Sequence, residues 1–408
     1  MSLLEERALA ALDPDALLAD AAALVQVPSV TGDERAVMER FAELAAARGL
    51  VTELHEHDLA ALRAHPDHPG EEAGRTELLG VTATAPGTSP GAPRLCLNGH
   101  LDVVDEGAEP WSGGGPWSGA LNGGRLHGRG AADMKAAVAA NLHAAAAIKA
   151  AGGAPGDVVV QAVASEEDGG LGTFAALERD AAFAACVIPE PTAFAVACAQ
   201  AGALTFTGTV PGVAAHAAVR LEGVSAIDRY VAIHRALAEL EAELNDGVNH
   251  SLMRELELPY PLSVGRIAGG RWSSSVPDHL EFEGRVGVPV GANPAAIRER
   301  LEAAVRRACP DAVVAWTGGA FHPGETRADD PLAVLVLSAV TDELGDEATP
   351  IGVPYGADMR LFCARGIPCV MVGTPGLEQA HAVDESVATS DVVTLARTLV
   401  RVIARFSG

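Results

Sequence analysis

The stretch RLCLNGHLDVV, residues 94–104, joins an apolar run to a histidine and an aspartate. Its first half, Arg94–Asn98, has the composition of a buried strand and leads almost directly into His100. Side chains alternate along an extended chain, so His100 and Asp102 point the same way. A carboxylate beside an imidazole fixes its tautomer and makes it a better metal ligand. The sequence therefore predicts a strand that ends at a candidate metal site, with an ordinary surface loop as the alternative.

Strands and helices alternate on both sides of this stretch. Residues 105–131 are rich in Gly and Pro and poor in core residues, and so long a loop inside a compact domain is usually functional. An Ala-rich helix is expected after it, over residues 132–151. The other expected elements are helices at 13–27, 32–48, 171–179, 331–344 and 387–405, and strands at 50–55, 158–163, 185–188 and 368–372. This alternation is typical of an α/β layer fold.

The pattern changes near residue 200. The order there is strand, helix, two strands, helix and strand, at 203–210, 225–244, 262–268, 279–288, 294–308 and 312–316. That βαββαβ order is typical of a small ferredoxin-like sheet with helices on one face. We therefore expect a mixed-sheet, helix-flanked α/β domain formed by residues 1–200 and 319–408. Into it a ferredoxin-like domain, residues 201–318, is inserted.

Composition excludes several classes of protein. With 29 Lys and Arg against 54 Asp and Glu, the chain of 408 residues has a formal net charge of −25, which repels nucleic acid and anionic lipid. The six cysteines are scattered without a C-x-x-C pair, which favours reduced thiols in a cytosolic protein. The first residues lack the pattern of a signal peptide, and the Ala-rich run 136–151 is too short to span a bilayer. We expect a cytoplasmic protein with no nucleic-acid or membrane partner.

Four more groups of ionisable residues stand where strands end or a helix begins. They are Asp133-Met-Lys135, the acidic run 165–170 with Glu166 and Glu167, Glu190 between two prolines, and His381. Taken alone, they have ordinary interpretations as a helix N-cap, a solvated acidic turn and plain turns. Together they place two imidazoles and three carboxylates at the strand ends of one sheet, where open α/β folds bind ligands. This set suits a pair of zinc-like ions that share one carboxylate, with a spare carboxylate left to accept a proton from water.

The motifs NGHLDVV, GRGAADMK, ASEED, PEPT and AHAVDES, in this order, carry a resemblance. They resemble the di-zinc metallopeptidase family of acetylornithine deacetylase, succinyl-diaminopimelate desuccinylase, aminoacylase and glutamate carboxypeptidase, over essentially the whole chain. The resemblance implies two divalent ions, zinc first and cobalt or manganese as alternatives. It implies that Asp133 bridges the ions, that Glu166 is the general base and that Asp102 orients one ligand. The implied metal ligands are His100, Asp133, Glu167, Glu190 and His381.

The resemblance also assigns roles to the inserted domain. His216 matches a histidine that reaches the active site of a neighbouring subunit and stabilises the oxyanion, so a homodimer through this lid domain is implied. Ser274 falls in a run that matches a substrate-binding stretch. The family's arginine anchor is replaced near Gly287, and Arg285, on the same side of the strand, can substitute for it. Arg360 is a second candidate for gripping a substrate carboxylate.

The function expected from these residues is metal-dependent hydrolysis of the amide bond of a small N-acyl amino acid or a related N-acyl amine. A dipeptidase or carboxypeptidase on the same scaffold is the alternative within enzymes. A non-catalytic dimeric interaction module is the alternative outside them. That last interpretation needs a lost metal ligand, and none of the five is missing.

Overall fold

The computed structural model describes residues 1–112 and 114–406. The chain divides into two compact units. The first unit comprises Met1–Cys198, Glu325–Ile351 and Leu361–Gly408, and the second comprises Ala199–Gly324 and Gly352–Arg360. The segment expected as an insertion, residues 201–318, lies within the second unit.

The main sheet of the first unit is mixed, as the sequence predicts. Its strands run in the order β1-β2-β6-β3-β7-β15-β8-β13, and β14 pairs with β8. The pairs β3–β6, β3–β7 and β7–β15 are parallel, whereas β1–β2, β2–β6 and β8–β15 are antiparallel. The carboxyl ends of the parallel strands therefore share one edge. The bounds are β1 Val51–Glu56, β2 Leu79–Ala85, β3 Leu95–His100, β6 Val158–Val163, β7 Ala185–Ile188, β8 Val196–Gln200, β13 Gly324–Glu325, β14 Pro350–Val353 and β15 Cys369–Met371.

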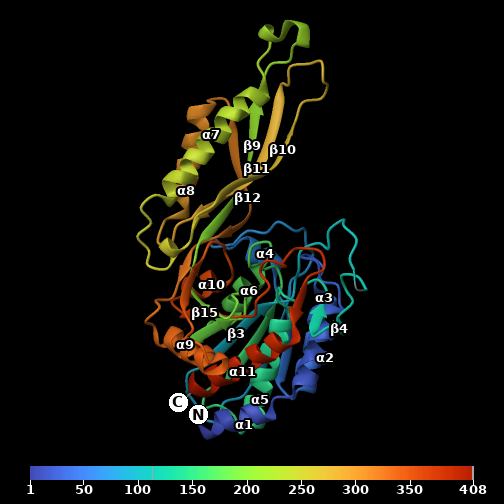
Figure 1. The fold of residues 1–408 in the computed structure, drawn as a ribbon, viewed down its shortest axis with the longest axis vertical. Helices are drawn as coiled ribbons and strands as arrows, with labels where there is room; N and C mark the ends of the chain where they lie inside the picture. Colours follow the sequence, from blue (N-terminus) through green and yellow to red (C-terminus); the bar gives the residue numbers. More distant parts are fainter. Residues whose placement is uncertain (113, 407–408) are drawn as a thin grey trace. The chain divides into compact units, whose positions relative to one another are not determined.

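Helices flank this sheet (Figure 1). Every residue of β3, β6 and β7 is buried, as expected for parallel strands covered on both faces. Helix α5, Lys135–Ala150, is buried over nearly its whole length because its small alanines let α1, α2, α11 and the sheet approach closely. The other helices are α1 Leu3–Ala11, α2 Pro14–Val25, α3 Arg35–Ala47, α4 Leu59–Arg63, α6 Leu171–Arg179, α9 Pro331–Leu344, α10 Met359–Cys363 and α11 Thr389–Phe406.

The glycine-rich stretch 105–131 is less irregular than the sequence indicates. It contains the hairpin β4 Ala120–Asn122 and β5 Arg125–His127, and β16 Ser386–Ala388 pairs with β5. The turn uses Gly123 and Gly124, both with positive φ, as a tight hairpin requires. Strands of three residues are too short for a periodic pattern, so the sequence predicts only a loop here.

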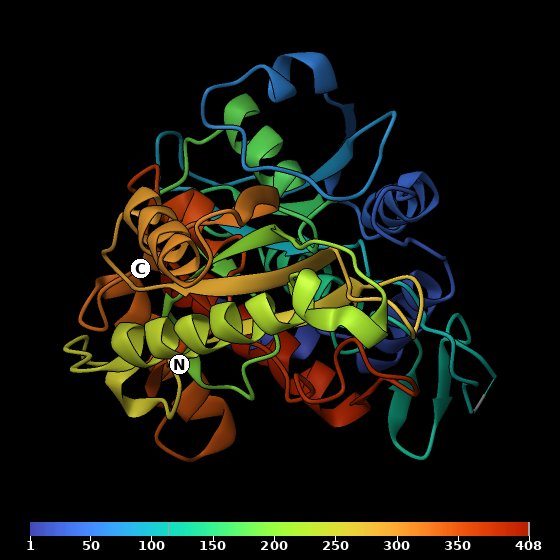
Figure 2. The ribbon, with the colours of Figure 1, turned by 90° about the horizontal axis from the view of Figure 1, so that it is seen from above.

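The second unit is a four-stranded antiparallel sheet in the order β10-β11-β9-β12. Its bounds are β9 Gly202–Pro211, β10 Leu262–Gly269, β11 His279–Val288, β12 Val313–Phe321, α7 Ala226–Asn245 and α8 Pro294–Ala308. The two helices pack together against the sheet, and α7 runs alongside the strands (Figures 1 and 2). Phe206, Phe282, Leu237 and Leu301 lie in the shared core. The βαββαβ order is the one expected from the sequence.

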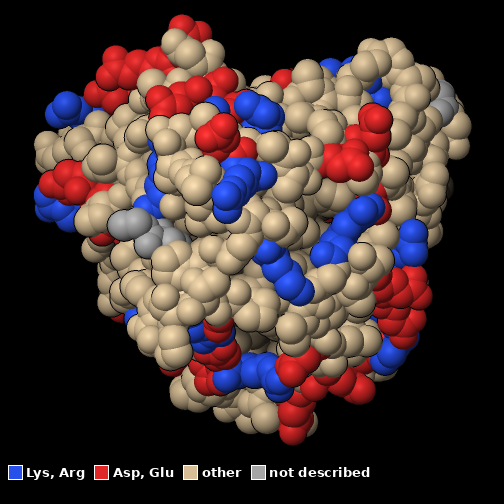
Figure 3. All heavy atoms as spheres, turned by 90° about the horizontal axis from the view of Figure 1, so that it is seen from below, with Lys and Arg blue, Asp and Glu red and all other residues tan. Residues whose placement is uncertain are grey.

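Acidic and basic side chains lie beside one another on the face shown in Figure 3. All six cysteines are free thiols, and five of them are buried. Within residues 1–112 and 114–406, no helix is both long and apolar enough to cross a membrane.

Candidate metal centre

Six ionisable side chains come together at the carboxyl-end edge of the parallel strands in the first unit. His100 is the last residue of β3, and the turn that follows β6 carries Glu166 and Glu167. Glu190 follows β7, and Asp133 stands just before α5. The sixth is His381, between β15 and β16. The strand topology thus gathers residues that are up to 281 positions apart in the chain (381 − 100).

Asp133 occupies the middle of this cluster. Its Oδ1 lies 3.0 Å from His100 Nε2, and its Oδ2 lies 3.8 Å from His381 Nε2. His381 Nε2 also lies 3.2 Å from Glu167 Oε2. The two oxygens of one carboxylate therefore face two different imidazoles, which is the arrangement that a bridging ligand needs.

Two overlapping groups of donors are compact enough to hold a cation. The ligand atoms of His100, Asp133 and Glu167 lie within 4.8 Å of one another, and so do those of His100, Glu166 and Glu190. The structure thus brings together all five predicted ligands. It also places Glu166, the predicted base, close enough to act as a ligand itself.

The tautomer of His100 is set by its backbone neighbour. Its Nδ1 lies 2.8 Å from the carbonyl oxygen of Asp102 and 3.6 Å from the Asp102 carboxylate. The contact that orients the ring is therefore made chiefly by the main chain of Asp102. Because Nδ1 donates to that carbonyl, Nε2 is the atom that faces the cluster and can bind a metal.

The Asp102 carboxylate also holds the neighbouring turn. It is fully buried and accepts hydrogen bonds from the backbone N–H groups of Glu166 and Glu167, both at 3.2 Å. Thr31 Oγ1 donates to it at 3.1 Å. Burial alone raises the pKa of Asp102, but its contacts with His100 and the two N–H groups outweigh this and lower it. Asp102 thus links the histidine of β3 to the two glutamates of the next turn.

The electrostatics of the cluster fit divalent cations. Burial raises the pKa of Glu167, which the nearby Asp133 carboxylate raises further against the lowering effect of His381. Burial lowers the pKa of His100, but Asp102 and Asp133 together raise it well above its ordinary value. Several carboxylates thus crowd a small, largely buried volume. Carboxylate and imidazole donors at this density are the ligand set that zinc and similar ions prefer.

Arg129 and Glu385 form a buried frame that the sequence analysis did not identify. Arg129 donates to Glu385 at 2.8 Å and to the backbone oxygen of His381 at 3.3 Å. Glu385 accepts the backbone N–H groups of Ala132 and Asp133 at 2.8 and 3.1 Å. The pair therefore links the segment that carries His381 to the segment that carries Asp133. Its only signal in the sequence is that each residue falls inside a family motif.

Four predicted site residues lie in the second unit. His216 is exposed and lies opposite Ser275 in an isolated antiparallel bridge, while the next residue, Ala217, donates to the backbone oxygen of Ser274 at 2.9 Å. Arg285 is exposed on β11. Arg360 is buried, with its guanidinium carbon 4.6 Å from the centre of the Phe321 ring. These residues do not belong to the six-residue cluster.

The chain matches known proteins over most of its length. A model of peptidase family M20/M25/M40 matches residues 96–405. A succinyl-diaminopimelate desuccinylase from Methylobacterium radiotolerans is 29% identical over 408 residues, covering 97% of this chain and 98% of that protein. A desuccinylase from Xanthomonas oryzae pv. oryzae is 31% identical over 321 residues, covering 75% of this chain and 81% of that protein.

Solved structures share the fold at low sequence identity. Aminopeptidase PepT from Bacillus cereus superposes with a TM-score of 0.73 at 20% identity, covering 98% of this chain and all of that one. A dinuclear metal-binding peptidase from Bacillus subtilis has a TM-score of 0.66 at 15% identity, with 97% and 98% of the two chains covered. These likenesses confirm the mixed α/β fold that the sequence predicts.

Proposed function

The chain belongs to peptidase family M20/M25/M40, and from that premise we propose that it is a deacylase of small N-acyl amino acids or related N-acyl amines. Membership confirms the resemblance drawn from the motifs and makes the chain a metal-dependent hydrolase of amide bonds. The observation that carries the proposal is the convergence of six donor side chains on one sheet edge, with one more carboxylate than the ligand set requires. Desuccinylases among its relatives support N-acyl amino acids as the substrate class.

The same residues supply the proposed metal ligands. Asp133 would bridge two divalent ions, zinc first and cobalt or manganese as alternatives, and the remaining ligands would be His100, Glu167, Glu190 and His381. When bound, such ions polarise an amide carbonyl and lower the pKa of water. Glu166 is then left to move protons.

Glu166 carries the proton transfers of the reaction. Its carboxylate accepts a proton from the attacking water, which adds its oxygen to the carbonyl carbon. Glu166 then gives that proton to the leaving nitrogen as the C–N bond breaks, so the products are a carboxylic acid, which keeps the second hydrogen of the water, and an amine. Asp102 keeps Glu166 in place through the backbone hydrogen bond, and His216 of a partner subunit donates to the oxyanion.

Mixing two inactive variants tests whether His216 acts across a dimer. We expect His216→Ala to lower kcat about 10²- to 10³-fold, as the loss of one oxyanion donor does. The His216→Ala chain is then unfolded and refolded with an equal amount of the Glu166→Gln chain, so that half of the dimers contain one chain of each kind. If His216 acts across the dimer, each of these mixed dimers has one site with both residues intact. Activity should then recover to about one quarter of the wild-type value. If His216 serves its own chain, no mixed site is complete and the mixture stays inactive.

Dipeptide hydrolysis is the second candidate function, because solved relatives include aminopeptidase PepT. A panel of N-formyl, N-acetyl and N-succinyl amino acids, compared with dipeptides, separates the two. We expect kcat/KM for the best N-acyl substrate to exceed that for the best dipeptide by at least about tenfold, the difference made by about 1.4 kcal/mol. The reverse order would identify a peptidase. Metal analysis that finds an empty site in protein purified without chelator would favour the non-catalytic module.

The remaining assignments complete the proposal. Arg285 and Arg360 are the candidates for binding the substrate carboxylate, with Ser274, which is hydrogen-bonded to Ala217, as a further contact. The second unit forms the homodimer. The enzyme works in the cytoplasm on a small-molecule substrate, in keeping with its free thiols and its net charge of −25.

A further inference from the structure

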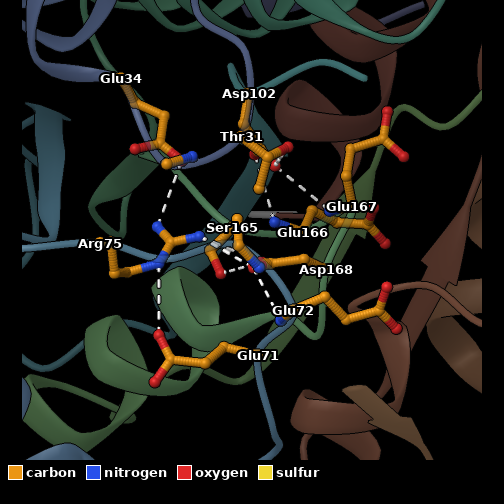
Figure 4. A network of polar contacts seen from close by, with 12 residues as sticks. Thr31, Glu34, Glu71, Glu72, Arg75, Asp102, Ser165, Glu166, Glu167 and Asp168 are labelled. Atoms are coloured by element: carbon orange, nitrogen blue, oxygen red, sulfur yellow. Dashed lines mark hydrogen bonds and ion pairs between the residues drawn. The ribbon is translucent and has the colours of Figure 1, made fainter. Parts of the chain in front are cut away.

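The turn that carries Glu166 and Glu167 has two sides, and the proposed chemistry uses only one. In Figure 4 the carboxylates of Glu166 and Glu167 point one way, while Ser165 and Asp168 lie toward Arg75. Ser165 Oγ donates to the Asp168 carboxylate within the turn. The second side of the turn therefore makes contacts that the proposed chemistry does not use.

The Asp168 carboxylate accepts several hydrogen bonds from residues 72–75, a segment far away in sequence. Arg75 Nη2 lies 3.1 Å from both of its carboxylate oxygens. The backbone N–H groups of Glu72 and Ala73 donate to Asp168 Oδ2 at 3.1 and 2.8 Å. Hydrogen bonds to a charged carboxylate are roughly twice as strong as neutral ones, so the segment is firmly attached to the turn.

Arg75 in turn is fixed by carboxylates on its other sides. Its side chain is fully buried, and it lies 3.2 Å from Glu34 and 3.5 Å from Glu71. The surrounding carboxylates raise the pKa of Arg75 against the lowering effect of burial, so it stays charged. The Arg75 guanidinium is therefore buried and held in place by three carboxylates, and it can anchor the turn through Asp168.

The turn needs such support because its backbone is strained. Ser165 adopts φ of +66°, a left-handed conformation that L side chains rarely adopt. Residues in such conformations persist only where their surroundings enforce them. Asp102 holds the turn through the N–H groups of Glu166 and Glu167, and Arg75 holds its far side through Asp168 (Figure 4).

We propose that Arg75 is a positioning residue that, through Asp168, sets the places of the Glu166 and Glu167 carboxylates. The roles of those two glutamates rest on the proposed function. The close contacts of Arg75 are with Glu34, Glu71 and Asp168, and of these only Asp168 belongs to the turn that carries the two glutamates. Losing it lets the turn relax, and a displacement of about 1 Å in a catalytic group can cost about 10²-fold in rate.

The test compares Arg75→Met, Arg75→Lys and Asp168→Asn with wild type. We expect Arg75→Met and Asp168→Asn to lower kcat by about 10²-fold and zinc affinity by about 10-fold or more, as supporting residues of metal sites do. KM should stay within about twofold, because Arg75 does not touch substrate. Arg75→Lys should recover part of both losses, since it keeps the charge but not the two-oxygen contact. Zinc affinity is measured by calorimetric titration of the metal-free protein with zinc chloride.

Arg401→Met is the matched control. Arg401 is largely buried and pairs with Glu5 at 2.6 Å and Glu343 at 2.8 Å, between helices α1, α9 and α11. Its loss should lower the Tm about as much as Arg75→Met while leaving kcat and zinc affinity at wild-type values.

A folded Arg75→Met protein with wild-type kcat and zinc affinity would show that the pair is only structural and would overturn the proposal. If Arg75→Met does not fold, Asp168→Asn and Arg75→Lys decide by the same two measurements. If wild type hydrolyses nothing in the panel, the proposed function fails, and the zinc titrations still decide the role of Arg75.

Discussion

Glu166→Gln is expected to lower kcat about 10²- to 10⁴-fold while the protein still binds its full complement of metal. Glutamine has nearly the shape of glutamate, and its backbone N–H can keep the hydrogen bond to Asp102. What it loses is the ability to accept and return a proton. The measurement is kcat on the best substrate together with metal content by mass spectrometry of the same preparation.

The adjacent glutamate provides the comparison. Glu166 lies near His100 and Glu190 closely enough to be a ligand, so its role must be separated from metal binding. Glu167→Gln should weaken zinc binding as well as turnover, because Glu167 lies in the group with His100 and Asp133 and also 3.2 Å from His381. Equal loss of metal from both variants would make Glu166 a ligand and contradict its assignment as the base.

Removal of metal is expected to abolish activity entirely and reversibly. Dialysis against a chelator such as dipicolinate should leave a folded protein without turnover, and zinc, cobalt or manganese should restore it. Zinc at a hundredfold excess over its Kd should stabilise the folded chain by about 2.7 kcal/mol at each site, because it binds the folded chain and not the unfolded one. The rise in Tm on adding zinc measures this.

Asp133→Asn tests whether one carboxylate bridges the two metal sites. An amide cannot bridge two cations as a carboxylate does, so both metal equivalents should be weakened by this single change. Loss of only one equivalent would place the bridge elsewhere. Activity that persists in chelated protein with no detectable metal would contradict the metal-dependent account.

The sequence predicts the strongly patterned elements closely. Strand β6 is a valine-rich run, and helix α9 begins at a proline after an aspartate N-cap, and both have the expected bounds. Strand β2, LGVTATA, was missed because Ala, Gly and Thr give it little hydrophobic contrast with the loop before it. Helix α1 is not predicted because its apolar residues are spread around the helix and not gathered on one face.

The residues of the candidate site are likewise predictable from the sequence only in part. The proposed ligands can be predicted because each stands in a recognisable motif, and His100, Glu167 and Glu190 also stand where strands end. Arg75 could not be found in this way, because its partner Asp168 is 93 residues away and a lone arginine in a glycine-containing loop forms no pattern. Such supporting contacts depend on tertiary structure, and a single sequence does not record them.

The most direct test of the whole account is anomalous diffraction from crystals of the zinc-loaded protein. We expect two zinc peaks about 3.5–4 Å apart, with Asp133 between them and His100 and His381 bound to different ions. A map in which His100 and His381 ligate no metal, or in which zinc binds away from Asp133, would contradict it.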